Sequence, residues 1–198
     1  MHAQNTIPFG STLSGRVITS YGEPIDAKGP LTGTQPVSLT TTERKGAQEP
    51  VLQLFETGIK VIDLLAPIPR GGLVSLVGGD GIGKMVVAEE IMHNIAIRQH
   101  GAIVCVEMDE NGYAFSPLTE TVKEANLQDR TIHLFEPQAA GRDIAQRIVQ
   151  AGVTIASHLH SQGSEVLLVI NLQQPLPDIL DNIAELKRVI QQQAITCL

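Results

Sequence analysis

Several kinds of residue are scarce in this 198-residue sequence, and each shortage excludes a class of protein. There is no Trp, and aromatic residues make up only 3% of the chain, so few flat side chains could stack on a nucleic-acid base. The formal net charge of −7, without a cluster of Lys and Arg, also argues against a nucleic-acid surface. No apolar run approaches membrane-spanning length, and residues 1–5 lack the charged and apolar regions of a signal peptide.

Cysteine is scarce as well. Cys105 and Cys197 lie far apart in the sequence, and Cys105 falls within a predicted strand. This spacing favours reduced thiols over a disulfide framework, so we expect a cytoplasmic protein. The chain is otherwise 42% hydrophobic and 18% charged, a composition typical of a soluble globular protein that is large enough to bury one good core.

The most informative segment that the sequence does contain is a glycine-rich run of eight residues. It fills every fixed position of the pattern G-x-x-x-x-G-K-[ST] except the last, which is Met85. Its glycines would let backbone N–H groups converge on a phosphate, and Lys84 would add a positive charge. The hydroxyl that Met85 replaces would contact Mg²⁺, whereas a thioether is a soft ligand. The predicted phosphate-binding residues are Gly78, Gly79, Asp80, Gly81, Ile82, Gly83, Lys84 and Met85.

The segments on either side fit a phosphate-binding loop. Residues 73–77 form a short apolar run that predicts a buried strand. Beyond the loop, apolar residues recur at four-residue spacing from Val87 to Ala96 and predict an amphipathic helix. The alternative interpretation is a tight turn whose lysine is merely solvated.

The rest of the chain falls into two regions that differ in their sequence patterns. Residues 1–50 hold short β-prone runs between turns rich in Gly and Pro, and predict a β-rich N-terminal segment. Residues 51–198 alternate apolar strands with amphipathic helices, which predicts an α/β domain with a parallel sheet covered on both faces. The predicted strands are 102–106, 131–135 and 165–170, and the predicted helices are 57–65, 116–126, 141–160 and 178–190.

Several segments together resemble the β subunit of F-type rotary ATP synthases. They are residues 14–17 (SGRV), 22–30 (GEPIDAKGP), 56–67 (ETGIKVIDLLAP), the loop 78–84 and the strand 166–171. The stretch 56–67 is the most specific, since many NTPases share the loop. The resemblance covers residues 14–171 and implies a RecA-like P-loop NTPase core.

The resemblance also implies roles for individual positions. Lys84 would contact the outer phosphates, while Met85 stands where a metal-binding hydroxyl is expected and Asn171 where a strand-end aspartate is expected. No metal ligand is therefore assigned, and a role for Mg²⁺ is doubtful. A catalytic glutamate should follow the second strand, where the weak candidates are Glu107, Asp109 and Glu110. The other interpretation of these three residues is that they are solvated acids.

The remaining polar residues suggest no further site. His158 and His160 are two residues apart on a predicted helix and so face different directions, and with His133 they make no convincing metal-binding set. Arg142 is interpreted as a surface charge, and residues 191–193 (QQQ) as a solvated helix end.

Three hypotheses follow from the sequence. The first is a degenerate, truncated paralogue of the ATP synthase β subunit, a pseudo-ATPase that binds ATP, ADP or phosphate. The second is an active Mg²⁺-dependent ATPase, or ATP synthase component, in which Asp80 or Asp109 acts on the metal through water. The third is a structural or interaction protein with a relic loop. An uncovered sheet edge or helix face also predicts a homodimer or an ATP synthase-like protein partner.

Overall fold

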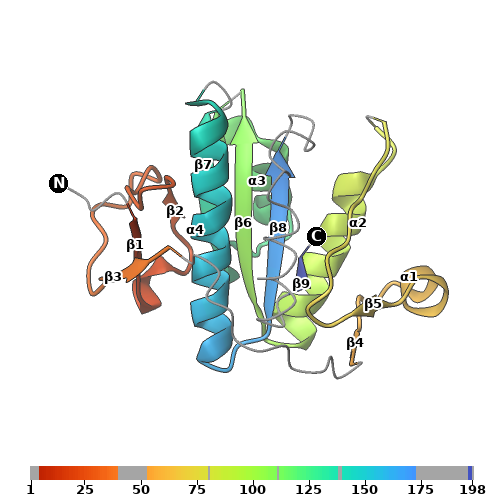
Figure 1. Ribbon diagram of the computed structural model, residues 1–198. Coiled ribbons are helices and arrows are strands. Elements are labelled where there is room, and N and C mark those ends of the chain that lie inside the picture. Colours follow the sequence, from red (N-terminus) through yellow and green to blue (C-terminus); the bar gives the residue numbers. More distant parts are fainter. Residues whose placement is uncertain are drawn as a thin grey trace.

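A five-stranded parallel sheet forms the centre of the protein (Figure 1). The computed structural model describes residues 5–39, 53–79, 81–110, 112–137, 140–172 and 196–197. All pairs of neighbouring strands in the sheet are parallel, which confirms the predicted α/β fold class with a mainly parallel sheet. The strand order is β2 (Val17–Ile18), β7 (Thr131–Pro137), β6 (Ala102–Asp109), β8 (Val166–Leu172) and β9 (Thr196–Cys197).

Helices cover both faces of the sheet. The 20-residue α4 (Arg142–Ser161) lies on one face, and α3 (Pro117–Glu124) lies on the other, with α2 (Lys84–His93) beside it (Figure 1). Side chains alternate along β6, so Val104 and Val106 belong to the core cluster that contains residues of α4. Ile103 and Cys105 belong to the cluster that contains residues of α2 and α3. The strands are therefore buried on both sides, as their continuous apolar sequences predict.

The N-terminal segment contains the short strands that the sequence predicts. β1 (Thr6–Phe9) pairs antiparallel with β3 (Gln35–Ser38), while β2 joins the main sheet beside β7. A bidentate ion pair between Arg16 and Asp26, with Arg16 Nε 2.7 Å from Asp26 Oδ2, holds the turn that follows β2. Residues 40–50 of the predicted segment lie outside the described residues.

Hydrogen bonds join the stretch 56–67 to itself and to the turn that follows α2. Asp63 accepts hydrogen bonds from the backbone N–H groups of Thr57 and Gly58 at 2.9 and 3.0 Å, which closes the entry to α1 (Lys60–Leu65). Asn94, at the start of a π-helical turn (Asn94–Arg98) after α2, donates Nδ2 to the carbonyl of Thr57 at 2.9 Å. The helix predicted over 57–65 begins only at Lys60, because these hydrogen bonds hold the residues before it outside the helix. The stretch lies between β4 (Leu54–Phe55) and β5 (Ile68–Pro69).

The strand predicted over residues 73–77 is wrong. Apart from one isolated bridge at Leu73, the run forms no strand, and Val77 is 87% exposed. Figure 1 shows the run passing alongside α2, where Val74 packs against the cluster shared with that helix. On the side toward α2, the sheet ends at the two-residue β9. Among the described residues, the run thus has no full-length neighbouring strand to pair with.

The other predicted elements are confirmed with small shifts at their ends. The predicted strands extend to residues 109, 137 and 172, and the helices predicted over 116–126 and 141–160 are α3 and α4. Short 3₁₀ turns cover Ser11–Leu13, Tyr113–Phe115 and Gln128–Arg130. The helix predicted over 178–190 and the run 191–193 lie outside the described residues. In the described part of the chain, no helix has both the length and the apolar character that crossing a membrane requires.

We expect the close approach of α4 to β6 to limit the size of residue 152. A Cβ on Gly152 would overlap the side chain of Val106, so Gly152→Ala should lower the free energy of unfolding by about 1–2 kcal/mol. The overlap has to outweigh the gain of about 1 kcal/mol that Ala brings to a helix. Urea unfolding measures the change. In a Val106→Ala background the same substitution should be stabilising, and a loss there would contradict the proposed overlap.

Candidate functional site

The described part of the glycine-rich run comprises residues 78–79 and 81–83, which precede α2, and Lys84 and Met85, which begin it. The residues before α2 lie toward the end of the molecule to which the sheet strands point (Figure 1). Gly81 and Gly83 have φ values of 74° and 86°, in the left-handed region where a side chain would be strained. Gly83 is the N-cap of α2 and makes no side-chain capping bond. The first N–H groups of a helix have no partner within that helix, so this end of α2 can donate to an anion.

Lys84 folds back over this loop. Its Nζ donates to the carbonyl oxygens of Gly78 and Gly79, the second at 2.9 Å. A Cβ added at Gly79, Gly81 or Gly83 would meet nothing within 4 Å, so open space surrounds these glycines. The loop therefore combines one positive charge with glycines whose Cβ positions are open.

The two positions expected to bind a metal do not fit Mg²⁺. Met85 is half-buried and packs against the core cluster shared by α2 and α3, and a thioether is a poor ligand for a hard cation. Asn171 directs Nδ2, a donor, at Glu107 Oε1, 2.8 Å away. Among the described residues, no group of three His, Cys, Asp or Glu side chains is placed to hold a metal ion.

Glu107 is the centre of a second polar group, on the α3 face of the sheet. It is fully buried and accepts hydrogen bonds from Ser116 Oγ at 2.7 Å, Asn171 Nδ2 at 2.8 Å and the backbone N–H of Leu118 at 3.2 Å. His133 Nε2 lies 3.2 Å from Glu107 Oε2. Leu118 is the second residue of α3, so Glu107 caps a helix whose own N-cap, Ser116, makes no capping bond.

These contacts keep Glu107 ionised. Burial alone would raise the pKa of its carboxyl group, but the contacts with His133, Ser116 and Asn171 together hold the pKa below its ordinary value of 4.5. Oε1 accepts two hydrogen bonds and Oε2 accepts one, with His133 Nε2 in contact with Oε2 at 3.2 Å. Glu107 is therefore neither a solvated loop acid nor a base open to solvent, and the structure places it inside the fold.

The strand register explains how this group comes together. Asn171 lies directly opposite Glu107 across the β6–β8 pair, and His133 lies opposite Cys105, two residues before Glu107, across the β6–β7 pair. All of these positions share one face, because successive side chains alternate between faces. The Tyr113 and His133 rings make a T-shaped contact, with the two ring centroids 5.7 Å apart.

His133 was missed as a partner of Glu107 in the sequence. A usable signal was present, because each residue interrupts an apolar strand and buried polar groups require partners. The order and register of the strands in the sheet cannot be derived from one sequence. His158 and His160 bind separate backbone carbonyls, those of Thr154 and Ser164, and neither joins the Glu107 group.

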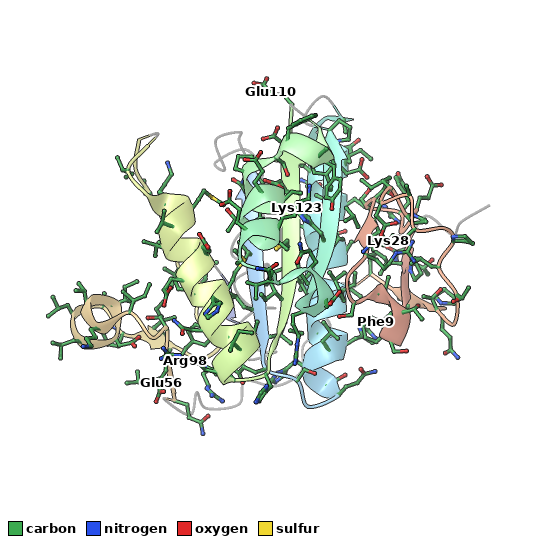
Figure 2. All side chains as sticks on the ribbon, turned by 180° about the vertical axis from the view of Figure 1, so that it is seen from behind. Phe9, Lys28, Glu56, Arg98, Glu110 and Lys123 are labelled. Atoms are coloured by element: carbon green, nitrogen blue, oxygen red, sulfur yellow. The ribbon has the colours of Figure 1, made fainter. Side chains whose placement is uncertain are left out.

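The other acidic candidates differ in their surroundings. Asp109 is fully buried and is the last residue of β6. Glu110 is exposed, and Figure 2 shows it at the edge of the molecule, pointing away from the body. Asp80 lies outside the described residues, as does the side chain of Arg142.

The structure therefore brings the predicted site residues together as two groups. One contains the glycines and Lys84 of the loop, and the other contains Glu107 and Asn171. The hydrogen bonds of Lys84 and those of Glu107 involve different residues.

Two comparisons with known proteins bear on this arrangement. The model of the ATP synthase alpha/beta family, nucleotide-binding domain, matches residues 58–190. An ATP synthase subunit beta from Coprothermobacter proteolyticus is 35% identical over 167 residues. That alignment covers 84% of this chain and 37% of the relative, so the chain spans well under half the length of the curated relative.

We expect Glu107 to make the protein sensitive to acid. Because its pKa is lowered on folding, its contribution to stability is complete above the unfolded value of about 4.5 and is lost as the pH falls through the folded value. Urea unfolding at several pH values should show a shallower loss below pH 4.5 in Glu107→Gln than in the wild type. Asp26 and Asp63, whose pKa values are also lowered, remain in both proteins as a common background. Equal slopes would contradict this role of Glu107.

Proposed function

Because the chain belongs to the ATP synthase alpha/beta family, we propose that it binds the phosphates of ATP or ADP at loop residues 78–85 and does not hydrolyse them efficiently. The observation that carries the proposal is the loop itself. It combines glycines with left-handed backbone, open space at the Cβ positions of Gly79, Gly81 and Gly83, a helix N-terminus without a side-chain cap, and the Lys84 ammonium. Such a loop binds an anion through backbone N–H groups and a point charge.

Weak or absent hydrolysis follows from the chemistry of two positions. Phosphoryl transfer depends on positioning and on neutralising charge, and a metal ion supplies much of both. Met85 offers sulfur packed against the core, and Asn171 offers an amide already bonded to Glu107. We therefore expect nucleotide binding that is nearly indifferent to Mg²⁺.

An active Mg²⁺-dependent ATPase is the alternative enzyme. It would require a carboxylate such as Asp80 or Asp109 to act on the metal through water. Glu107 does not support this alternative, because it is surrounded by donors from its own fold.

Titration calorimetry with ADP, with and without Mg²⁺, tests the proposal. Lys84→Ala should weaken binding at least about tenfold, since a hydrogen bond to a charged group contributes about 1.5–3 kcal/mol. The matched control is Lys123→Ala, because Lys123 lies on α3 over the Tyr113 ring and takes no part in the loop (Figure 2). Equal binding by the wild type and Lys84→Ala would remove the loop as the site. Steady Mg²⁺-dependent phosphate release, lost in Lys84→Ala, would establish the alternative.

A second function, protein association, is favoured by one observation on α1. Val61, Leu64 and Leu65 are 66%, 78% and 75% exposed on this six-residue helix. Their spacing places them on one face. Three neighbouring apolar side chains in water favour contact with another protein surface, and a second copy is the commonest closed solution.

We expect Leu64→Lys to reduce self-association without unfolding the protein, because the side chain is already largely in water. Light scattering coupled to size exclusion, across a wide concentration range, measures the mass. The control is Ile25→Lys, since Ile25 is a 40% exposed apolar residue in the N-terminal segment. A wild type that is monomeric throughout, and unchanged by Leu64→Lys, would count against an interface at α1.

A further inference from the structure

Two donors share one oxygen of Glu107. Oε1 accepts the backbone N–H of Leu118 at 3.2 Å and the side-chain Nδ2 of Asn171 at 2.8 Å. A carboxylate oxygen can only accept hydrogen bonds and a backbone N–H can only donate, so neither contact can reverse its direction. The atom of residue 171 that faces Oε1 must therefore be a hydrogen-bond donor.

The strand pairing holds the side chains of residues 107 and 171 beside each other. Glu107 is fully buried and lies directly opposite Asn171 across the β6–β8 pair, so both side chains stand on one face of the sheet. The contacts with Ser116 Oγ at 2.7 Å and His133 Nε2 at 3.2 Å are made by the other oxygen, Oε2. Among the residues that the structure describes, only Leu118 and Asn171 donate to Oε1. A side chain with the shape of asparagine at position 171 would therefore meet Oε1.

We propose that Glu107 excludes a divalent metal ion from the end of β8, because it requires residue 171 to be a neutral hydrogen-bond donor. An aspartate at this position would place a second carboxylate against Oε1, and two carboxylates so close together cannot both be ionised. The new group would keep its proton and donate it to Oε1, and a protonated carboxyl group is a poor ligand for Mg²⁺. A single substitution therefore cannot turn Asn171 into a metal ligand. This inference concerns the metal alone and does not depend on phosphate binding at the loop.

Asn171→Asp tests whether the fold tolerates an ionised group at this position. In the unfolded chain the new carboxyl group ionises above about pH 4, whereas in the folded protein we expect it to keep its proton to a higher pH. A group whose pKa is raised on folding makes the protein less stable as the pH rises. Relative to the wild type, the unfolding equilibrium constant of Asn171→Asp should increase by up to about tenfold per pH unit, until the folded protein also loses this proton. Urea unfolding at several pH values measures the increase.

The matched control is Asn126→Asp, which adds the same charge at an exposed position. The side-chain amide of Asn126 donates to the backbone carbonyl of Glu124 at 3.4 Å and does not face a carboxylate. The pH dependence of this control should follow that of the wild type. Equal pH dependence in Asn171→Asp and Asn126→Asp would overturn the proposal.

Two further measurements on Asn171→Asp test the same proposal. In ¹³C NMR spectra of the folded variant, the introduced carboxyl group should have the shift of the protonated form at neutral pH. Mg²⁺ should change the urea midpoint no more than it does in Asn126→Asp. An ionised group in the folded variant, or a rise in the midpoint with Mg²⁺ that the control does not share, would contradict the exclusion of the metal by Glu107.

A variant that is unfolded at neutral pH still decides the question. Under the proposal, Asn171→Asp should then refold on mild acidification, because the new group regains its proton. A loss of folding that acid does not restore would count against the proposal. None of these measurements uses a nucleotide, so a failure here leaves the proposed phosphate binding to be decided separately by calorimetry with ADP.

Discussion

A negative charge buried at the carboxyl end of the central strand requires hydrogen-bond donors. The donors that bind Glu107 determine much of the surrounding structure. Its carboxylate accepts hydrogen bonds from the Ser116 hydroxyl, the Asn171 side-chain amide on β8 and the backbone N–H of Leu118, the second residue of α3, with His133 of β7 alongside. An unpaired buried charge would destabilise the fold by several kcal/mol. Satisfying it fixes where α3 begins relative to three strands, and the positive end of the helix dipole further favours the anion.

The loop before α2 depends on its backbone conformation and not on a buried, neutralised charge. Its conformation depends on glycines at positive φ, and only the Lys84 ammonium adds a side-chain charge. Such a loop can receive an anion through backbone N–H groups. An unneutralised carboxylate near the same edge would repel phosphate, and the donors around Glu107 reduce that repulsion. The enclosed carboxylate and the open loop are thus compatible at one end of the sheet.

Local sequence signals predicted much of this fold, and long-range pairing accounts for what they missed. Ser116 before Pro117 marked the start of α3, and the apolar runs marked β6, β7 and β8, because caps and burial depend on neighbouring residues. Residues 73–77 have the composition of a strand but lack a full neighbour among the described residues, and composition cannot supply a neighbour. The loop glycines were likewise visible in the sequence. The partnership of Glu107 with His133 and Asn171 depended on strand order and register, which one sequence does not contain.

Strand register also changes the meaning of Asn171. By resemblance alone, an amide at the position of an aspartate is a loss of charge. In the structure, Glu107 lies directly opposite on the adjacent strand, with 2.8 Å between Asn171 Nδ2 and Glu107 Oε1. Two carboxylates at that distance cannot both stay ionised, since each raises the pKa of the other. With Glu107 buried and ionised, residue 171 must therefore be neutral and able to donate, and asparagine meets both conditions with the shape of aspartate. The amide at this edge is best understood as one half of a matched pair whose negative charge lies one strand away.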